Sequence, residues 1–305
     1  MSIKRVAGFY NLPPRPRGSD ERLLLLPAPP NLDKIIARIQ AAPDIDADDK
    51  EWFLDLLQNF HKWMCHDHHL QTVTFELQGN LPFFDTEIFT LGLLTDAQDR
   101  GVDRNKRFDS ICERLEMLVD LLVLEYCSMW GYKNPPNLPL PAHSYHPSVN
   151  VEKYRKIEKL INQLIERTPV SPTLNKISQA AQKNRSLSIG VQLEMYDVVP
   201  QIHKIMCEEH VHQTVSAGYN VERYPFEIAE VKMKGLFTKI KVREAKTKED
   251  IQFLNTLTST PPIQQIISEY MAEWDYQKAE GTDYYTHKIG TPVSIEPTFK
   301  VRLRR

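Results

Sequence analysis

The chain has 305 residues, of which 41% are hydrophobic and 26% are charged, as in ordinary soluble globular proteins. Its formal net charge of −2 excludes long-range attraction to nucleic acid or anionic lipid, so such a contact requires a local patch. The length suits two domains, no apolar run is long enough to span a membrane, and four irregularly spaced cysteines indicate an intracellular, reducing compartment.

The first predicted element is an extended N-terminal arm over residues 1–29. Prolines recur through this segment, and because they have a fixed φ and no N–H, they favour a stiff, extended chain. The run from Pro13 to Arg17 is a candidate ligand for a proline-binding partner protein. An arm that packs on its own protein is the alternative.

Two helices are predicted next, and each has a counterpart 142 residues later. The short first helix begins at Pro30, and its counterpart begins at Pro172. The second begins near Asp48, and in its counterpart Pro200 is expected to start or kink the helix. Each long helix has a core stripe at helical spacing: Phe53, Leu57, Phe60 and Met64 in the first, and Met195, Val199, Ile202 and Met206 in the second.

The long helix contains a motif that the chain carries twice. Residues 61–68 read HKWMCHDH, and residues 203–210 read HKIMCEEH. Over the wider windows 55–74 and 197–216, nine of twenty positions are identical. Unrelated segments of this length share roughly one or two residues. We interpret the match as an internal duplication.

Segments 82–95 and 225–238 match at an offset of 143, but their patterns conflict. The first reads as a helix, whereas residues 232–242 alternate as the strands of a hairpin do. Because homologous segments share one structure, we expect helices, with a small β-hairpin in each copy as the alternative.

A long helix over residues 107–132 completes the first copy. It ends in the pattern EYxxxWxY at 125–132, which recurs at 269–276 with an offset of 144. One-residue loop insertions explain the drift of the offset from 142 to 144.

The chain is thus divided into an arm (1–29), a first helical copy (30–134), a proline-rich connector (135–150), a second copy (151–278) and a polar tail with a basic end (279–305). We predict a mainly α-helical fold in which the two copies pack about a pseudo-twofold axis.

The repeated motif contains candidate metal ligands. On a helix, three side chains of each copy share one face: His61, Cys65 and His68, and His203, Cys207 and His210. Zinc binds this mixture of nitrogen and sulfur, either as one ion that bridges the copies or as one ion in each. The alternative is that the cysteines are small buried hydrophobes and the histidines are hydrogen-bonded.

Glu125 and Glu269 are a second repeated pair, and each follows apolar helix residues. A carboxylate near a packed surface needs a partner or a raised pKa. Each glutamate is a candidate acid or base, or a member of a buried ion pair with Lys62 or Lys204.

The repeated aromatic residues are Trp130, Tyr132, Trp274 and Tyr276. They could line a protein interface, where large aromatics with polar tips concentrate. Alternatively they lock the helix ends onto the bundle.

The segment 232–248 is basic only in the second copy, and its candidate anion contacts are Lys232, Lys234, Lys239, Lys241 and Arg243. Such a run could meet an anionic partner such as RNA. A solvated face is the alternative, because acidic residues interrupt the run.

These observations favour a non-catalytic interaction or scaffolding protein that engages partner chains in a larger assembly. A zinc-dependent enzyme with Glu125 or Glu269 as acid or base is the first alternative. An RNA-binding protein that uses the basic segment is the second.

Overall fold

The computed structural model of the protein describes residues 26–73, 83–99, 106–130, 151–216, 220–221, 226–278 and 285–287. The described chain is mainly helical, which confirms the predicted fold class at this level. Most of the predicted arm, Tyr132, the connector and most of the tail lie outside the described residues. None of the helices in the described ranges has the length and apolar character that a membrane span requires.

In the first half the helices are α2 (Pro30–Ala41), α3 (Ala47–Val73), α4 (Phe84–Asp99) and α5 (Lys106–Met129). In the second half they are α6 (Val151–Arg167), α7 (Pro172–Lys183), α8 (Ile189–Ser216), α9 (Glu227–Glu244), α10 (Lys248–Thr258) and α11 (Thr260–Glu273). Three short strands, β1 (Asn220–Val221), β2 (Tyr276–Lys278) and β3 (Tyr285–His287), form an antiparallel sheet in the order β1-β3-β2. Pro200 lies inside α8 and does not start it.

Local sequence signals explain where several helices begin. Pro30 and Pro172 stand in the first turns of α2 and α7, where a missing N–H removes no helix hydrogen bond. The hydroxyl of Ser171 accepts an N–H of the first turn of α7. Thr247 and Asp250 form a capping box at the start of α10, so the second half divides its last long helix into α10 and α11.

α4 and α9 are both helices, so the alternative of a β-hairpin in these segments is wrong. Every residue of α4 from Thr86 to Ala97 is buried, and in α9 nearly every residue from Ala229 to Ile240 is buried. A helix that protein surrounds on all sides needs no polar face, so its sequence lacks the periodicity of a surface helix. Without a helical period in α9, the alternation of charged and apolar residues over 232–242 resembled the pattern of a strand.

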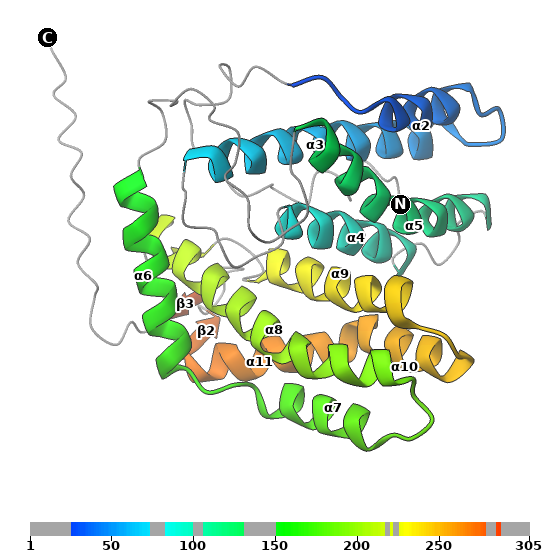
Figure 1. The fold of residues 1–305 in the computed structure, drawn as a ribbon. Coiled ribbons are helices and arrows are strands. Elements are labelled where there is room, and N and C mark those ends of the chain that lie inside the picture. Colours follow the sequence, from blue (N-terminus) through cyan, green and yellow to red (C-terminus); the bar gives the residue numbers. More distant parts are fainter. Residues whose placement is uncertain are drawn as a thin grey trace, which may run out of the picture.

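The two most buried helices form the centre of the molecule. Figure 1 shows α4 beside α9, with the other helices of each half on either side. The buried apolar residues form two clusters, one in each half. Ile88 of α4 belongs to the cluster of the second half, and Val231 of α9 belongs to that of the first. The contact between α4 and α9 is therefore part of both cores.

Candidate functional site

The two halves approach each other most closely where α4 meets α9. A Cβ atom on Gly92 would lie 1.9 Å from the carbonyl oxygen of Val231, and one on Gly235 would lie 1.7 Å from that of Ile88. Both distances are far below any van der Waals contact, so only glycine permits this packing. The contact fixes which residues of α9 face α4.

The basic side chains of α9 pair with carboxylates of the first half. Lys239 Nζ is 2.6 Å from Glu87 Oε2, and Lys234 Nζ is 2.8 Å from Asp96 Oδ1. The other pairs join Lys232 to Asp85 (3.4 Å), Lys241 to Glu116 (3.4 Å), and Arg243 to Glu87 (3.1 Å) and Asp120. In the structure, these five cations are paired with carboxylates of the same chain.

The central pairs are buried on both sides. Lys234, Lys239, Glu87 and Asp96 are all buried. Burial by itself lowers the pKa of a lysine; Asp96 nevertheless raises the pKa of Lys234, whereas the pKa of Lys239 stays lowered. A buried charge without a partner costs several kcal/mol, so these pairs require α4 and α9 to stay together.

Two histidines of the repeated motif are hydrogen-bonded to tyrosines. His61 Nδ1 lies 2.6 Å from the hydroxyl of Tyr126, and His203 Nδ1 lies 2.6 Å from that of Tyr270. Nε2 of His203 lies 3.1 Å from the carbonyl oxygen of Ile165. A carbonyl oxygen only accepts, so Nε2 carries a proton and both ring nitrogens of His203 are engaged.

Cys65 and Cys207 are buried thiols. Burial raises the pKa of both thiols, that of Cys207 to about 12, so both are protonated at neutral pH in the metal-free chain. In the part of the chain that the structure describes, no three His, Cys, Asp or Glu side chains are grouped so that they could hold a metal. Within the described residues the predicted ligands therefore do not gather into a zinc site, either one that bridges the halves or one in each half.

The other two histidines of the motif stack on tryptophans. The ring centroids of His68 and Trp130 are 4.4 Å apart, and those of His210 and Trp274 are 4.3 Å apart. The hydroxyl of Tyr276 lies 2.8 Å from His210 Nδ1. Trp274 and Tyr276 are buried and Trp130 is partly buried, so these aromatics lock the ends of α5 and α11 onto the bundle.

Glu269 holds the start of α7 against α11. Its carboxylate accepts hydrogen bonds from the Ser171 hydroxyl (2.5 Å) and from the Thr173 N–H (3.0 Å). Burial alone would raise the pKa of Glu269, but these hydrogen bonds lower it to about 2. Lys204, the partner expected for Glu269, pairs with Glu208 at 3.4 Å instead.

Glu125 lacks the support that Glu269 has. Its Oε2 atom is buried and has no hydrogen-bond partner within the described residues. The positions that match Ser171 and Thr173 are Pro29 and Asn31, which carry no hydroxyl groups. The expected partner Lys62 is exposed. Glu125 and Glu269 therefore have different surroundings despite the sequence match.

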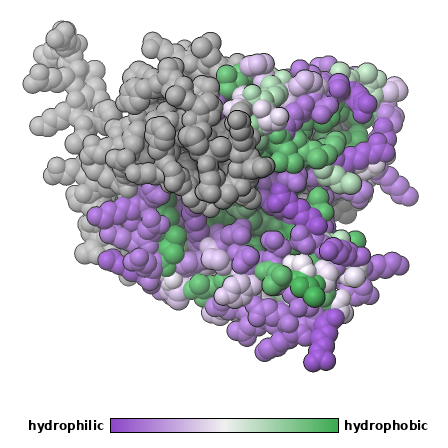
Figure 2. Space-filling view, viewed as in Figure 1, coloured by the Kyte–Doolittle hydropathy of each residue, from purple (hydrophilic) through white to green (hydrophobic). Residues whose placement is uncertain are grey.

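Two exposed apolar stripes, which the sequence patterns did not reveal, lie on α5 and α8. Met117, Leu121 and Leu124 of α5 are 66%, 59% and 56% exposed, and Ile189, Leu193 and Tyr196 of α8 are 74%, 64% and 66% exposed. Figure 2 shows apolar surface over both helices on the face in view. The solvent side of a helix is normally polar, so the stripes are unusual. The available signal was that residues 115–126 are richer in apolar side chains than one core stripe requires.

The matching positions of the other half differ in chemistry. The positions 144 residues after the α5 stripe are Pro261, Gln265 and Ser268. The positions 142 residues before the α8 stripe are Ala47, Glu51 and Leu54. All of these are exposed except Leu54, which is partly buried. Apart from Leu54, the matched positions are thus exposed as well, but only the stripes on α5 and α8 consist entirely of large apolar side chains.

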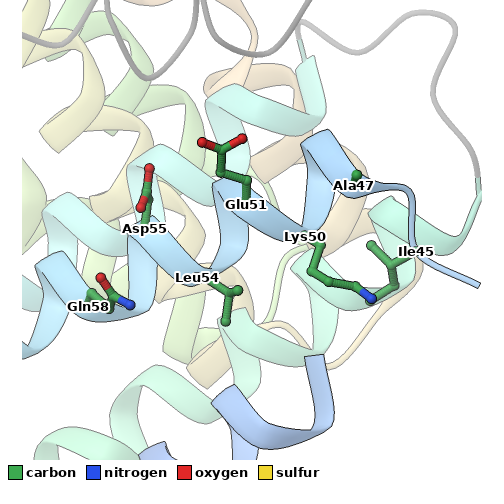
Figure 3. A pocket seen from close by; sticks show the side chains of 7 residues that line it. All are labelled: Ile45, Ala47, Lys50, Glu51, Leu54, Asp55 and Gln58. Carbon is green, nitrogen blue, oxygen red and sulfur yellow. The ribbon is translucent and has the colours of Figure 1, made fainter. Parts of the chain in front are cut away.

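An open depression at the start of α3 is lined by Ile45, Ala47, Lys50, Glu51, Leu54, Asp55 and Gln58 (Figure 3). Lys50 Nζ donates to the carbonyl oxygens of Gln40 (3.1 Å) and Ala42 (2.8 Å), so the ammonium group of Lys50 caps the C-terminal end of α2. A second depression on α10 is lined by Lys248, Ile251, Gln252, Asn255, Thr256 and Ser259. Both depressions are open to solvent.

Comparison with models of known protein families, with curated proteins and with solved structures finds no significant match.

Proposed function

We propose that the chain is an internally duplicated pseudodimer that serves as a non-catalytic interaction module. The duplication is supported by contacts that recur between matched residues. In each half the first histidine of the motif is hydrogen-bonded to a tyrosine and the last one stacks on a tryptophan. Phe83 and Phe226 precede α4 and α9, and both have a positive φ, of 66° and 73°. A bulky residue rarely adopts this conformation, so its recurrence at matched positions supports common descent.

Reciprocal contacts between α4 and α9 support the pseudo-twofold arrangement. Across a twofold axis, if residue i meets residue j, then j meets i. Gly92 and Gly235 are 143 positions apart, and so are the residues whose carbonyls they meet. Thr95 and Thr238 are also 143 apart, and their Oγ1 atoms are 2.6 Å from each other. A residue that meets its own counterpart lies on the axis.

The single observation that carries the interaction role is the pair of exposed stripes. We call this surface the α5–α8 face and define it by Met117, Leu121, Leu124, Ile189, Leu193 and Tyr196. Burying one such side chain gains about 1.5–3 kcal/mol, so a partner that covers several of them gains substantial affinity. Gln265 and Glu51 occupy matched exposed positions, which indicates that the scaffold does not need apolar residues there.

The contacts of the other candidate residues do not favour the two alternatives. The hydrogen bonds that occupy both ring nitrogens of His203 oppose a zinc centre. Glu269 stabilises the start of α7 and is fully engaged in doing so. The cations of α9 lie against carboxylates of α4 and α5, so they do not form a basic surface for RNA.

Site-specific photo-crosslinking in the cells of origin tests the interaction role. A photoreactive amino acid is placed at Leu121 or Leu193, and at the matched controls Gln265 or Glu51. We expect discrete crosslinked products from the first two positions and none from the controls, because only the α5–α8 face is covered by a partner. The same products at all four positions, or none at any, would contradict the proposal.

A further inference from the structure

Charged residues of α9 lie between the two stripes of the α5–α8 face and contact both α5 and α8. Asp120 of α5 pairs with Arg243 of α9. The carboxylate of Glu244 lies over the first turn of α8, where a Cβ on Gly190 would be 2.1 Å from its Oε2. Val242, between these two contacts, is itself exposed. Both stripes therefore lie beside the C-terminal half of α9. In Figure 1, α5 lies on the α4 side of the α4–α9 pair and α8 lies on the α9 side.

Carboxylates gather along the α8 side of this face. Glu194 and Asp197 flank the stripe on α8, and Glu244 approaches from α9. Burial raises the pKa of Glu194, and repulsion from Glu244 and Asp197 raises it further, although Lys239 and Arg243 oppose this. Lys239 and Arg243 are already paired with Glu87. A cation that a partner brings to Glu194 would relieve the remaining repulsion.

Building on the proposed interaction function, we infer that the α5–α8 face binds an amphipathic helix that carries Lys or Arg beside its apolar stripe. A stripe with i, i+4, i+7 spacing extends over about 10 Å, or two helical turns. A partner helix with large apolar residues at the same spacing packs against it, as helices do in helix-in-groove recognition. Cations on the flank of that helix then meet Glu194, Asp197 and Glu244.

The same charges disfavour other occupants. A second copy of this chain would bring identical carboxylates to the contact, and like charges at an interface cost several kcal/mol. An anionic membrane or a nucleic acid would be repelled for the same reason. A basic helix is the partner that satisfies both the apolar stripes and the acidic flank.

The test uses the full-length chain and two labelled synthetic helices, followed by fluorescence anisotropy. Both helices carry leucines along one stripe; one has lysines beside them and the other has glutamates. We expect the lysine helix to bind about tenfold more tightly, a difference of about 1.4 kcal/mol, and to weaken as salt rises. Leu121→Glu and Leu193→Glu should each weaken it about tenfold or more, since each puts a charge into the apolar contact. The matched variant Gln265→Glu should leave binding unchanged, and Glu194→Gln should reduce only the preference for lysine.

The outcomes separate this inference from the interaction role itself. Equal binding of both helices, lost in Leu121→Glu, overturns the basic partner and leaves the face as a binding surface. If neither helix binds while the crosslinks at Leu121 and Leu193 persist, the helical partner is wrong and the interaction module stands. A concentration-dependent dimer that Leu193→Glu dissociates, seen by sedimentation, assigns the face to a second copy and overturns the inference. Binding that Leu121→Glu and Leu193→Glu leave intact places the helix elsewhere and overturns it as well.

Discussion

Replacing Gly235 with alanine tests the central contact most directly. The added Cβ would lie 1.7 Å from the carbonyl oxygen of Ile88, and 3.0 Å is the shortest separation that real Cβ atoms reach, so α9 must move about 1.3 Å away from α4. The obstacle is backbone inside a helix that is itself buried, so it cannot rotate aside. Overpacking of this kind costs about 1–3 kcal/mol. Movement of α9 also stretches the buried pairs Lys239–Glu87 and Lys234–Asp96, whose disruption adds to that cost.

We expect Gly235→Ala to lower the free energy of unfolding by at least about 3 kcal/mol, measured by urea denaturation followed by circular dichroism. Gly190→Ala is the matched control, because its Cβ meets the flexible carboxylate end of Glu244 and alanine favours a helix by up to about 1 kcal/mol. The control should unfold within about 1 kcal/mol of the original chain. A Gly235→Ala protein as stable as the control would refute the close packing of α4 and α9.

Three further predictions concern single side chains. Lys239→Met should lower the free energy of unfolding by about 3 kcal/mol, measured by urea denaturation. This is the low end for a broken buried pair, because Arg243 remains 3.1 Å from Glu87. Adding Glu87→Gln to the same chain should recover part of the loss. The pKa of Glu269 in the folded chain is about 2, below its usual 4.5, so its hydrogen bonds stabilise the fold above pH 4.5. This contribution disappears as the pH falls towards 2. Glu269→Gln should therefore make the free energy of unfolding less dependent on pH between about 4.5 and 2. The thiol of Cys207 is buried and has a pKa of about 12, so at neutral pH we expect it to react with a thiol reagent only after unfolding, and rapid labelling of the native chain would contradict its placement.

The helices with one buried face could be predicted because their sequences are periodic. The stripe of Phe53, Leu57, Phe60 and Met64 in α3 is buried throughout, as its spacing indicated. Pro30 and Pro172 marked the starts of α2 and α7 correctly. The same reasoning could not settle α4 and α9, because a helix that is buried all round has no periodic signal.

The candidate site was harder to predict, because its residues acquire their roles from distant partners. Lys234 and Lys239 looked like part of a basic surface, yet their carboxylate partners are 138 and 152 residues away in the sequence. His61 and His203 had the spacing of metal ligands, but tyrosines from other helices occupy their Nδ1 atoms. Local spacing identifies which residues share a helix face, whereas only packing determines what that face meets.

The distribution of charge between α4 and α9 adds a reason for the two halves to differ. In a symmetric dimer the positions of Asp96 and Lys239, which are 143 apart, would carry the same residue. Here the first half supplies carboxylates and the second supplies the cations that pair with them, so each half fits the other better than it would fit itself. Under the proposed duplication, these charge pairs keep the two halves together, so the two outward faces are free to diverge. Polar residues around Gln265 and apolar residues around Leu121 agree with the proposal that only one of these faces binds a partner.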